Sequence, residues 1–84
     1  EENKALLNLV TALNKVKQNT EAEKIQTIIY TIGKENGYSS DLRSWFKLIY
    51  EVVFGEENGP RMGFFISFFG VKETIDLIEK KLNI

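Results

Sequence analysis

The sequence predicts an all-α fold, a compact bundle of about five helices. Apolar residues recur at spacings of three and four along most of the chain, the periodicity of amphipathic helices. No segment has the alternating pattern of a half-buried strand. Glycine and proline fall where the helical pattern breaks, and the loops are short, so successive helices should pack as neighbours.

The first two helices are expected over about residues 4–17 and from Thr20 to Gly37. The segment Thr20-Glu21-Ala22-Glu23 has the spacing of a capping box at the start of the second helix. Gly33 should weaken that helix by roughly 1 kcal/mol relative to alanine, and Gly37 should end it. The residues expected to be buried are Leu6, Leu7 or Leu9, Val10, Leu13 and Val16 in the first helix, and Ile25, Ile28, Ile29 and Ile32 in the second.

The third helix should be central, because it is apolar over a wide arc. Ser39 or Ser40 is expected to cap it, and Gly55 to end it. Its expected core face consists of Leu42, Trp45, Phe46, Ile49, Tyr50 and Val53. Leu48 and Val52 lie off that face.

Two shorter segments complete the predicted bundle. A fourth helix is expected from Pro60 to Phe69, because proline suits the first helical position and Gly70 follows. The fifth should bury Val71, Ile75, Ile78 and Leu82.

Composition narrows the possible functions. The 84 residues suffice for one domain, 1–84, with a modest core. There is no Cys and no His, which removes disulfides, thiolate metal sites and the commonest general base. The pairs of carboxylates fit turns and caps, so we expect no catalysis and no cofactor in this segment. The chain begins Glu1-Glu2 without Met, which leads us to expect a segment of a longer protein.

Charge and hydropathy indicate a module without a strong electrostatic attraction for nucleic acid and without a membrane segment. The net charge is −1, so any nucleic acid must be held by a few contacts. The apolar run from Phe64 to Phe69 is far shorter than the ~20 residues of a membrane span, and no signal peptide is recognisable. We therefore expect a cytoplasmic, monomeric segment that does not contact a membrane.

The charged candidates for binding lie in or near the third and fourth helices. Arg61 is expected in the first helical turn, where the helix dipole disfavours a cation and the backbone N–H groups favour anions. It could bind a phosphate or a base edge, or form a salt bridge with Glu56, Glu57 or Glu51. Arg43 and Lys47 could contact phosphates, or form an ordinary solvated face.

The aromatic candidates are Trp45 and Tyr50. Both combine an apolar ring with a polar atom that needs a partner. They could line a pocket and stack on unpaired bases, or they could simply pack in the core. Both interpretations stay open at this point.

One ordered series of residues resembles the C-terminal end of class I lysyl-tRNA synthetases. It comprises Trp45-Phe46-Lys47, Tyr50, Gly55-Glu56, Gly59-Pro60-Arg61, Gly63 and Phe65-Ile66, and the tail from Phe69 to Ile75 continues it. The resemblance covers most of the chain and is strongest from Leu42 onward. It implies an all-helical anticodon-binding domain, similar to the last domain of bacterial glutamyl-tRNA synthetases.

The resemblance also implies a site and partners. In those relatives, anticodon bases are contacted by the turn into the penultimate helix and by a residue about nine positions upstream. The turn corresponds here to Gly59, Pro60, Arg61 and Met62, and the upstream residue corresponds to Tyr50. The glutamyl relatives have Arg at the position of Tyr50, so stacking or a hydroxyl contact would replace a guanidinium. The implied partners are the anticodon loop of tRNA(Lys) and a catalytic domain of the same chain, which alone would use ATP and Mg²⁺. The alternative is a helical protein-interaction module that docks through Leu48, Val52 and Phe64.

Overall fold

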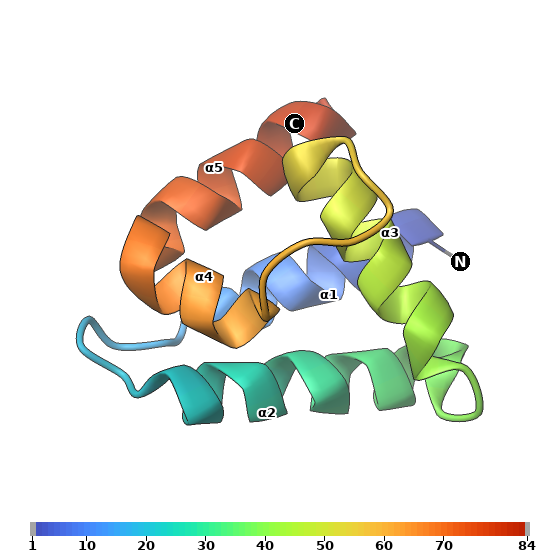
Figure 1. Ribbon diagram of the computed structural model, residues 1–84, viewed down its shortest axis with the longest axis horizontal. Helices are drawn as coiled ribbons and strands as arrows, with labels where there is room; N and C mark the ends of the chain where they lie inside the picture. Colours follow the sequence, from blue (N-terminus) through green and yellow to red (C-terminus); the bar gives the residue numbers. More distant parts are fainter. Residues whose placement is uncertain (1, 84) are drawn as a thin grey trace.

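Five α-helices form the part of the chain that the computed structural model describes, residues 2–83. They are α1 (Glu2–Leu13), α2 (Ala22–Gly33), α3 (Leu42–Phe54), α4 (Met62–Phe69) and α5 (Val71–Leu82), and a π-helical turn, η1 (Lys34–Tyr38), follows α2 directly. In the view of Figure 1, α1 lies behind the other helices, and the segment after α3 crosses the face of the molecule to reach α4. No strand occurs in residues 2–83, so the all-α prediction is confirmed.

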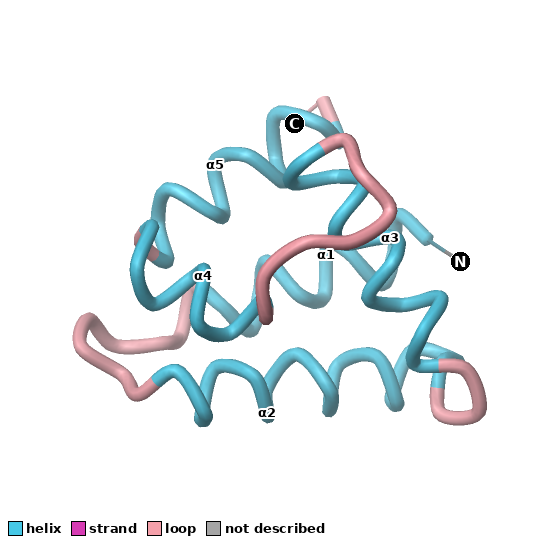
Figure 2. Tube along the Cα trace, viewed as in Figure 1, coloured by secondary structure: helices cyan, strands magenta, loops and turns pink. Residues whose placement is uncertain are grey.

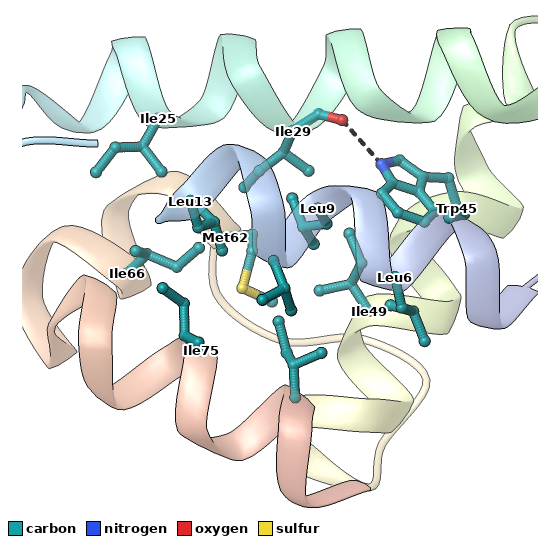
Figure 3. Packing of buried hydrophobic residues seen from close by; sticks show 13 residues of the cluster. Leu6, Leu9, Leu13, Ile25, Ile29, Trp45, Ile49, Met62, Ile66 and Ile75 are labelled. Atoms are coloured by element: carbon teal, nitrogen blue, oxygen red, sulfur yellow. Dashed lines mark hydrogen bonds between the residues drawn. The ribbon is translucent and has the colours of Figure 1, made fainter. Parts of the chain in front are cut away.

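The five helices share one hydrophobic core. Figure 3 shows this core, to which α3 contributes Trp45 and Ile49. Its fully buried members are Ala5, Leu6, Leu9, Val10, Leu13, Ile25, Ile29, Trp45, Ile49, Met62, Ile66, Ile75 and Ile78. Of the two alternatives Leu7 and Leu9, Leu9 is buried and Leu7 is exposed.

Trp45 packs across α2, and Gly33 makes this packing possible. The indole Nε1–H donates a hydrogen bond to the Ile29 carbonyl oxygen, at 2.9 Å. A Cβ atom at Gly33 would overlap the indole ring. The glycine that weakens α2 locally is therefore needed for the packing of α3 against α2.

Several predicted helix ends are wrong by a few residues, for reasons that are visible in the hydrogen bonds. The capping box does not form, because the Thr20 hydroxyl donates back to the Lys17 carbonyl and α2 begins after Glu21 without a side-chain cap. Asp41, rather than Ser39 or Ser40, caps α3, since its carboxylate accepts from the backbone N–H and the hydroxyl of Ser44. These two bonds lower the pKa of Asp41.

Helical geometry ends at the predicted glycines after α2 and α3, whereas α1 ends earlier than predicted. The chain leaves helical geometry at Asn36 and at Gly37, where φ is 95°. Gly55 ends α3 with φ 73°, and its N–H donates to the Glu51 carbonyl at 2.9 Å. The first helix stops at Leu13, earlier than expected, although Val16 still packs on the core.

Candidate nucleic-acid interface

Several of the residues singled out by the sequence lie in or beside the loop from Gly55 to Arg61, which joins α3 to α4. Figure 2 shows this loop as an extended segment on the near face, between the end of α3 and the start of α4. Every residue from Gly55 to Arg61 is exposed. We call the surface formed by this loop and the adjoining faces of α2, α3 and α4 the loop face.

Gly59 lies against two aromatic rings of α3. A Cβ atom at this position would come within 3.1 Å of Phe54 Cε2 and 3.4 Å of Tyr50 Cδ1. The rings of Tyr50 and Phe54 are themselves stacked, with centroids 6.1 Å apart and an interplanar angle of 23°. The structure therefore brings together Tyr50 and Gly59, which the sequence had linked only by resemblance.

Tyr50 is half-buried, and a second tyrosine lies near it. Burial, and secondarily the neighbouring Tyr30, raise the pKa of the Tyr50 phenol, so it stays protonated at neutral pH. Tyr30, on α2, is 37% exposed and packs edge-on against Phe46 of α3, with ring centroids 5.0 Å apart. The aromatic part of the loop face thus extends from α3 to α2.

Arg61 is the N-cap of α4 rather than a residue of its first turn. Its extended backbone (φ −57°, ψ 123°) places Met62 as the first helical residue, so the prediction that Pro60 begins the helix is wrong. The guanidinium forms an ion pair with Glu23 of α2 at 3.3 Å, not with Glu51, Glu56 or Glu57.

The Arg61 guanidinium stays accessible despite this ion pair. Its carbon lies 5.4 Å from the centroid of the Phe64 ring, which is 48% exposed. The Arg61 side chain is 54% exposed and that of Glu23 is 65% exposed. Exposed pairs of this kind contribute only about 0–1 kcal/mol, so a phosphate or a base edge can compete for the guanidinium.

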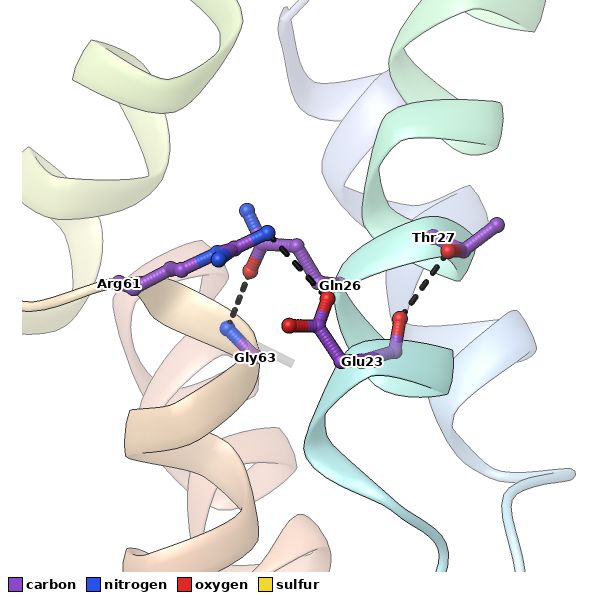
Figure 4. Close-up of polar contacts among 5 residues, drawn as sticks. All are labelled: Glu23, Gln26, Thr27, Arg61 and Gly63. Atoms are coloured by element: carbon purple, nitrogen blue, oxygen red, sulfur yellow. Dashed lines mark hydrogen bonds and ion pairs between the residues drawn. The ribbon is translucent and has the colours of Figure 1, made fainter.

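A second contact ties the start of α4 to α2. The Gly63 N–H donates to Gln26 Oε1 at 2.6 Å, and this bond is buried (Figure 4). A Cβ atom at Gly63 would come within 2.7 Å of the Gln26 backbone nitrogen, so only glycine permits this approach. Gln26 therefore caps α4 from a neighbouring helix. Gln26 is not among the residues singled out from the sequence, because no sequence pattern pairs a glutamine with an N–H donor 37 residues away.

Two of the predicted binding residues face the core. Trp45 has no exposed surface, and its polar atom already bonds to Ile29, so its ring cannot stack on a base. The Met62 side chain is also fully buried. We therefore correct the prediction for both side chains, and only the backbone of Met62, at the start of α4, belongs to the loop face.

The remaining predicted residues are exposed. Arg43 and Lys47 precede Tyr50 by seven and three residues, so the three share one face of α3. Lys47 Nζ lies 3.8 Å from Glu57 of the loop, and both side chains are largely exposed. Pro60 is exposed between Gly59 and Arg61. The loop face thus combines aromatic rings with cations that are paired only weakly.

A metal site and a membrane-spanning helix are both absent from residues 2–83. No group of three or more His, Cys, Asp or Glu in this part of the chain could hold a metal ion. None of its helices is long and apolar enough to cross a bilayer. An open groove of about 940 Å³ lies between the loop after α1 and the α4–α5 corner, but it contains none of the predicted binding residues.

Known proteins with similar sequences point to one group. The chain is 43% identical over 83 residues to the lysine–tRNA ligase of Rickettsia felis, and 42% identical over 83 residues to that of Rickettsia prowazekii. Each match covers 98% of this chain but only 16% of the relative. No family model and no solved structure matches the chain. In agreement with the resemblance in its sequence, the chain is a homologue of a segment of the lysine–tRNA ligases.

Proposed function

We propose that residues 1–84 form the anticodon-binding domain of a class I lysine–tRNA ligase, and that the loop face binds the anticodon loop of tRNA(Lys). The names of the relatives support the choice of tRNA(Lys) as the partner. The observation that carries the proposal is the position of Gly59 on the rings of Tyr50 and Phe54, two residues before Arg61. This arrangement places the aromatic surface of α3 beside the loop that carries the Arg61 guanidinium.

The rings of the loop face suit unpaired bases. Proteins read RNA sequence mainly in single-stranded loops, where bases can stack on aromatic side chains and expose their edges. Each such stack is worth about 1–3 kcal/mol. Tyr50 and Tyr30 would supply stacking surface, and the backbone at Gly59 and Met62 would lie close enough to a base edge for hydrogen bonds.

The cations would orient the loop rather than drive binding. Arg61 would exchange Glu23 for a phosphate or a base edge, and Lys47 would likewise exchange Glu57. Together with Arg43, these residues would make about three phosphate contacts. A plot of the logarithm of affinity against the logarithm of salt concentration should then have a slope of roughly −2. A stronger salt dependence would indicate a larger electrostatic footprint than the loop face offers.

The other parts of the reaction belong to the rest of such an enzyme. The chain spans about one sixth of the relatives' length. We propose that a catalytic domain outside these residues binds ATP and Mg²⁺ and attaches lysine, and that this segment contributes recognition without a cofactor. A cytoplasmic location and a monomeric segment fit this role.

An NMR titration of the ¹⁵N-labelled chain tests the proposal. The ligand is a tRNA(Lys) anticodon stem-loop at low salt, with a stem-loop of scrambled loop sequence as the control. Selective shifts at Tyr50 and from Gly59 to Met62 are expected. Equal shifts with both RNAs, or no shifts, would contradict sequence-specific recognition.

A protein-docking role is the second candidate, and it is favoured by the outer face of α4. Phe68 is 92% exposed there, and Phe64 is 48% exposed. Leu48 and Val52, by contrast, are partly buried against the core, so the predicted docking patch is reduced to Phe64. Substitution of Phe68 by Ser should leave RNA binding unchanged if the loop face is the site.

A further inference from the structure

Gln26 is a nearly buried polar residue whose side-chain oxygen is hydrogen-bonded and whose side-chain nitrogen is not. It is 5% exposed and lies between α2 and the start of α4. Its carboxamide has one acceptor atom, Oε1, and one donor group, Nε2. Oε1 accepts the Gly63 N–H at 2.6 Å.

This bond fixes the direction of the donor group. A flipped carboxamide would set Nε2–H₂ against the Gly63 N–H, two donors facing each other, so the orientation follows from chemistry. Nε2 therefore lies on the far side of the carboxamide from Gly63, as Figure 4 shows. No acceptor within residues 2–83 bonds to it. In that same part of the chain every deeply buried side-chain nitrogen or oxygen has a partner, so Nε2 must reach the surface.

The surface that Nε2 reaches is the loop face. Glu23 and Gln26 are three residues apart on α2 and so lie one above the other on the same helix face. Glu23 binds Arg61, and Gln26 binds Gly63, so the two contacts form parallel bridges from α2 to the start of α4. The free amide donor and the Arg61 guanidinium thus belong to the same small area.

We propose that Gln26 is a specificity-determining residue, whose Nε2–H₂ donates to a carbonyl oxygen or ring nitrogen on the edge of the unpaired base that Arg61 approaches. This inference rests on the proposed function. Gly63 orients the amide before RNA arrives, so the donor needs no reordering on binding. A base whose edge offers no acceptor at that point would leave the Gln26 Nε2–H₂ donor unpaired. The free-energy cost of this missing hydrogen bond would discriminate against such a base.

The substitution Gln26→Glu separates the two roles of the side chain. A glutamate keeps the shape and an acceptor for the Gly63 N–H, but it has no Nε2–H₂ donor. Because it also adds a negative charge, Thr27→Glu is the matched control, since Thr27 is the exposed next residue of α2. The affinity of the 84-residue chain is measured by fluorescence anisotropy for stem-loops with each loop base replaced singly.

The proposal predicts a change in selectivity rather than a uniform loss. Gln26→Glu should reduce the preference for the natural base at one loop position by about 5- to 10-fold, the size of one neutral hydrogen bond. Thr27→Glu should weaken all the RNAs in parallel and preserve their ratios. Preserved ratios in Gln26→Glu would overturn the inference, whereas a wild-type chain that does not distinguish the loops would overturn the proposed function itself.

A measurement on the wild-type chain keeps the inference testable if Gln26→Glu fails to fold. The two side-chain amide protons of Gln26 give their own NMR signals. On addition of the natural stem-loop, one of them should shift and become protected from solvent exchange. Unchanged side-chain signals, together with shifts at Arg61, would overturn the inference.

Discussion

Two regions of α3 use the same arrangement, an aromatic ring on a glycine, for opposite purposes. At the start of the helix, Trp45 covers Gly33 of α2 and is completely buried. Near its end, Tyr50 and Phe54 hold Gly59 of the loop and remain partly exposed. The difference teaches that the polar atom decides the role of each ring. The Trp45 N–H donates to the Ile29 carbonyl oxygen inside the protein, whereas the Tyr50 hydroxyl makes no hydrogen bond within residues 2–83.

Removal of the buried ring of Trp45 should have the largest effect on stability. Trp45→Ala should destabilise the fold by about 3–5 kcal/mol, because it leaves a cavity at the centre of the core. For a domain of 84 residues that is much of the total stability. Urea denaturation followed by circular dichroism checks this. A folded, equally stable variant that had lost only RNA binding would show that Trp45 belongs to the site after all.

The two glycines should respond differently to the same added methyl group. Gly33→Ala should destabilise by about 1–3 kcal/mol, because the methyl overlaps the indole of Trp45 in a packed interior. Gly59→Ala should stay within about 0.5 kcal/mol of the wild type, because the loop is exposed and can move. Thermal melts of both variants, with Thr31→Ala as an exposed control in α2, test the contrast. Equal melting temperatures for Gly33→Ala and Gly59→Ala would refute it.

The half-buried ring of Tyr50 should matter for RNA binding more than for folding. Tyr50→Ala should weaken binding of the anticodon stem-loop by about 1–3 kcal/mol through lost stacking. Tyr50→Phe, which keeps the ring, should retain most of the affinity. If Tyr50→Phe lost as much as Tyr50→Ala, the hydroxyl rather than the ring would make the contact.

The smallest expected effect concerns the ion pair beside the loop. Glu23→Gln should raise RNA affinity about two- to threefold, because it releases Arg61 from an exposed pair that contributes about 0–1 kcal/mol. Anisotropy titrations at two salt concentrations measure this, with the exposed Glu35→Gln as the control. Reduced affinity in Glu23→Gln would mean that Glu23 positions Arg61 for binding instead of competing with the RNA.

The helices could be predicted from the sequence because each has a continuous apolar face, and because a glycine lies at or near the end of α2, α3 and α4. The cap of α3 could not, since three capping residues stand in a row from Ser39 to Asp41, and only the backbone geometry selects Asp41. The burial of Trp45 depends on Gly33, which is twelve residues away. The cap that Gln26 provides depends on a donor from another helix, Gly63 of α4, which no local pattern contains.

The bridges between α2 and α4 also bear on the order in which the chain folds. At eight residues, α4 is too short to persist alone in water, where helices below about 12–15 residues are marginal. Its starting point is held by residues 37 and 38 positions earlier in the chain, so the intervening loop must close first. The loop face should therefore form among the last parts of the molecule. A chain in which only the first three helices have formed would have the rings of Tyr50 and Phe54, but the loop that carries Gly59 would not yet be packed against them. Binding of RNA would therefore report that folding is complete.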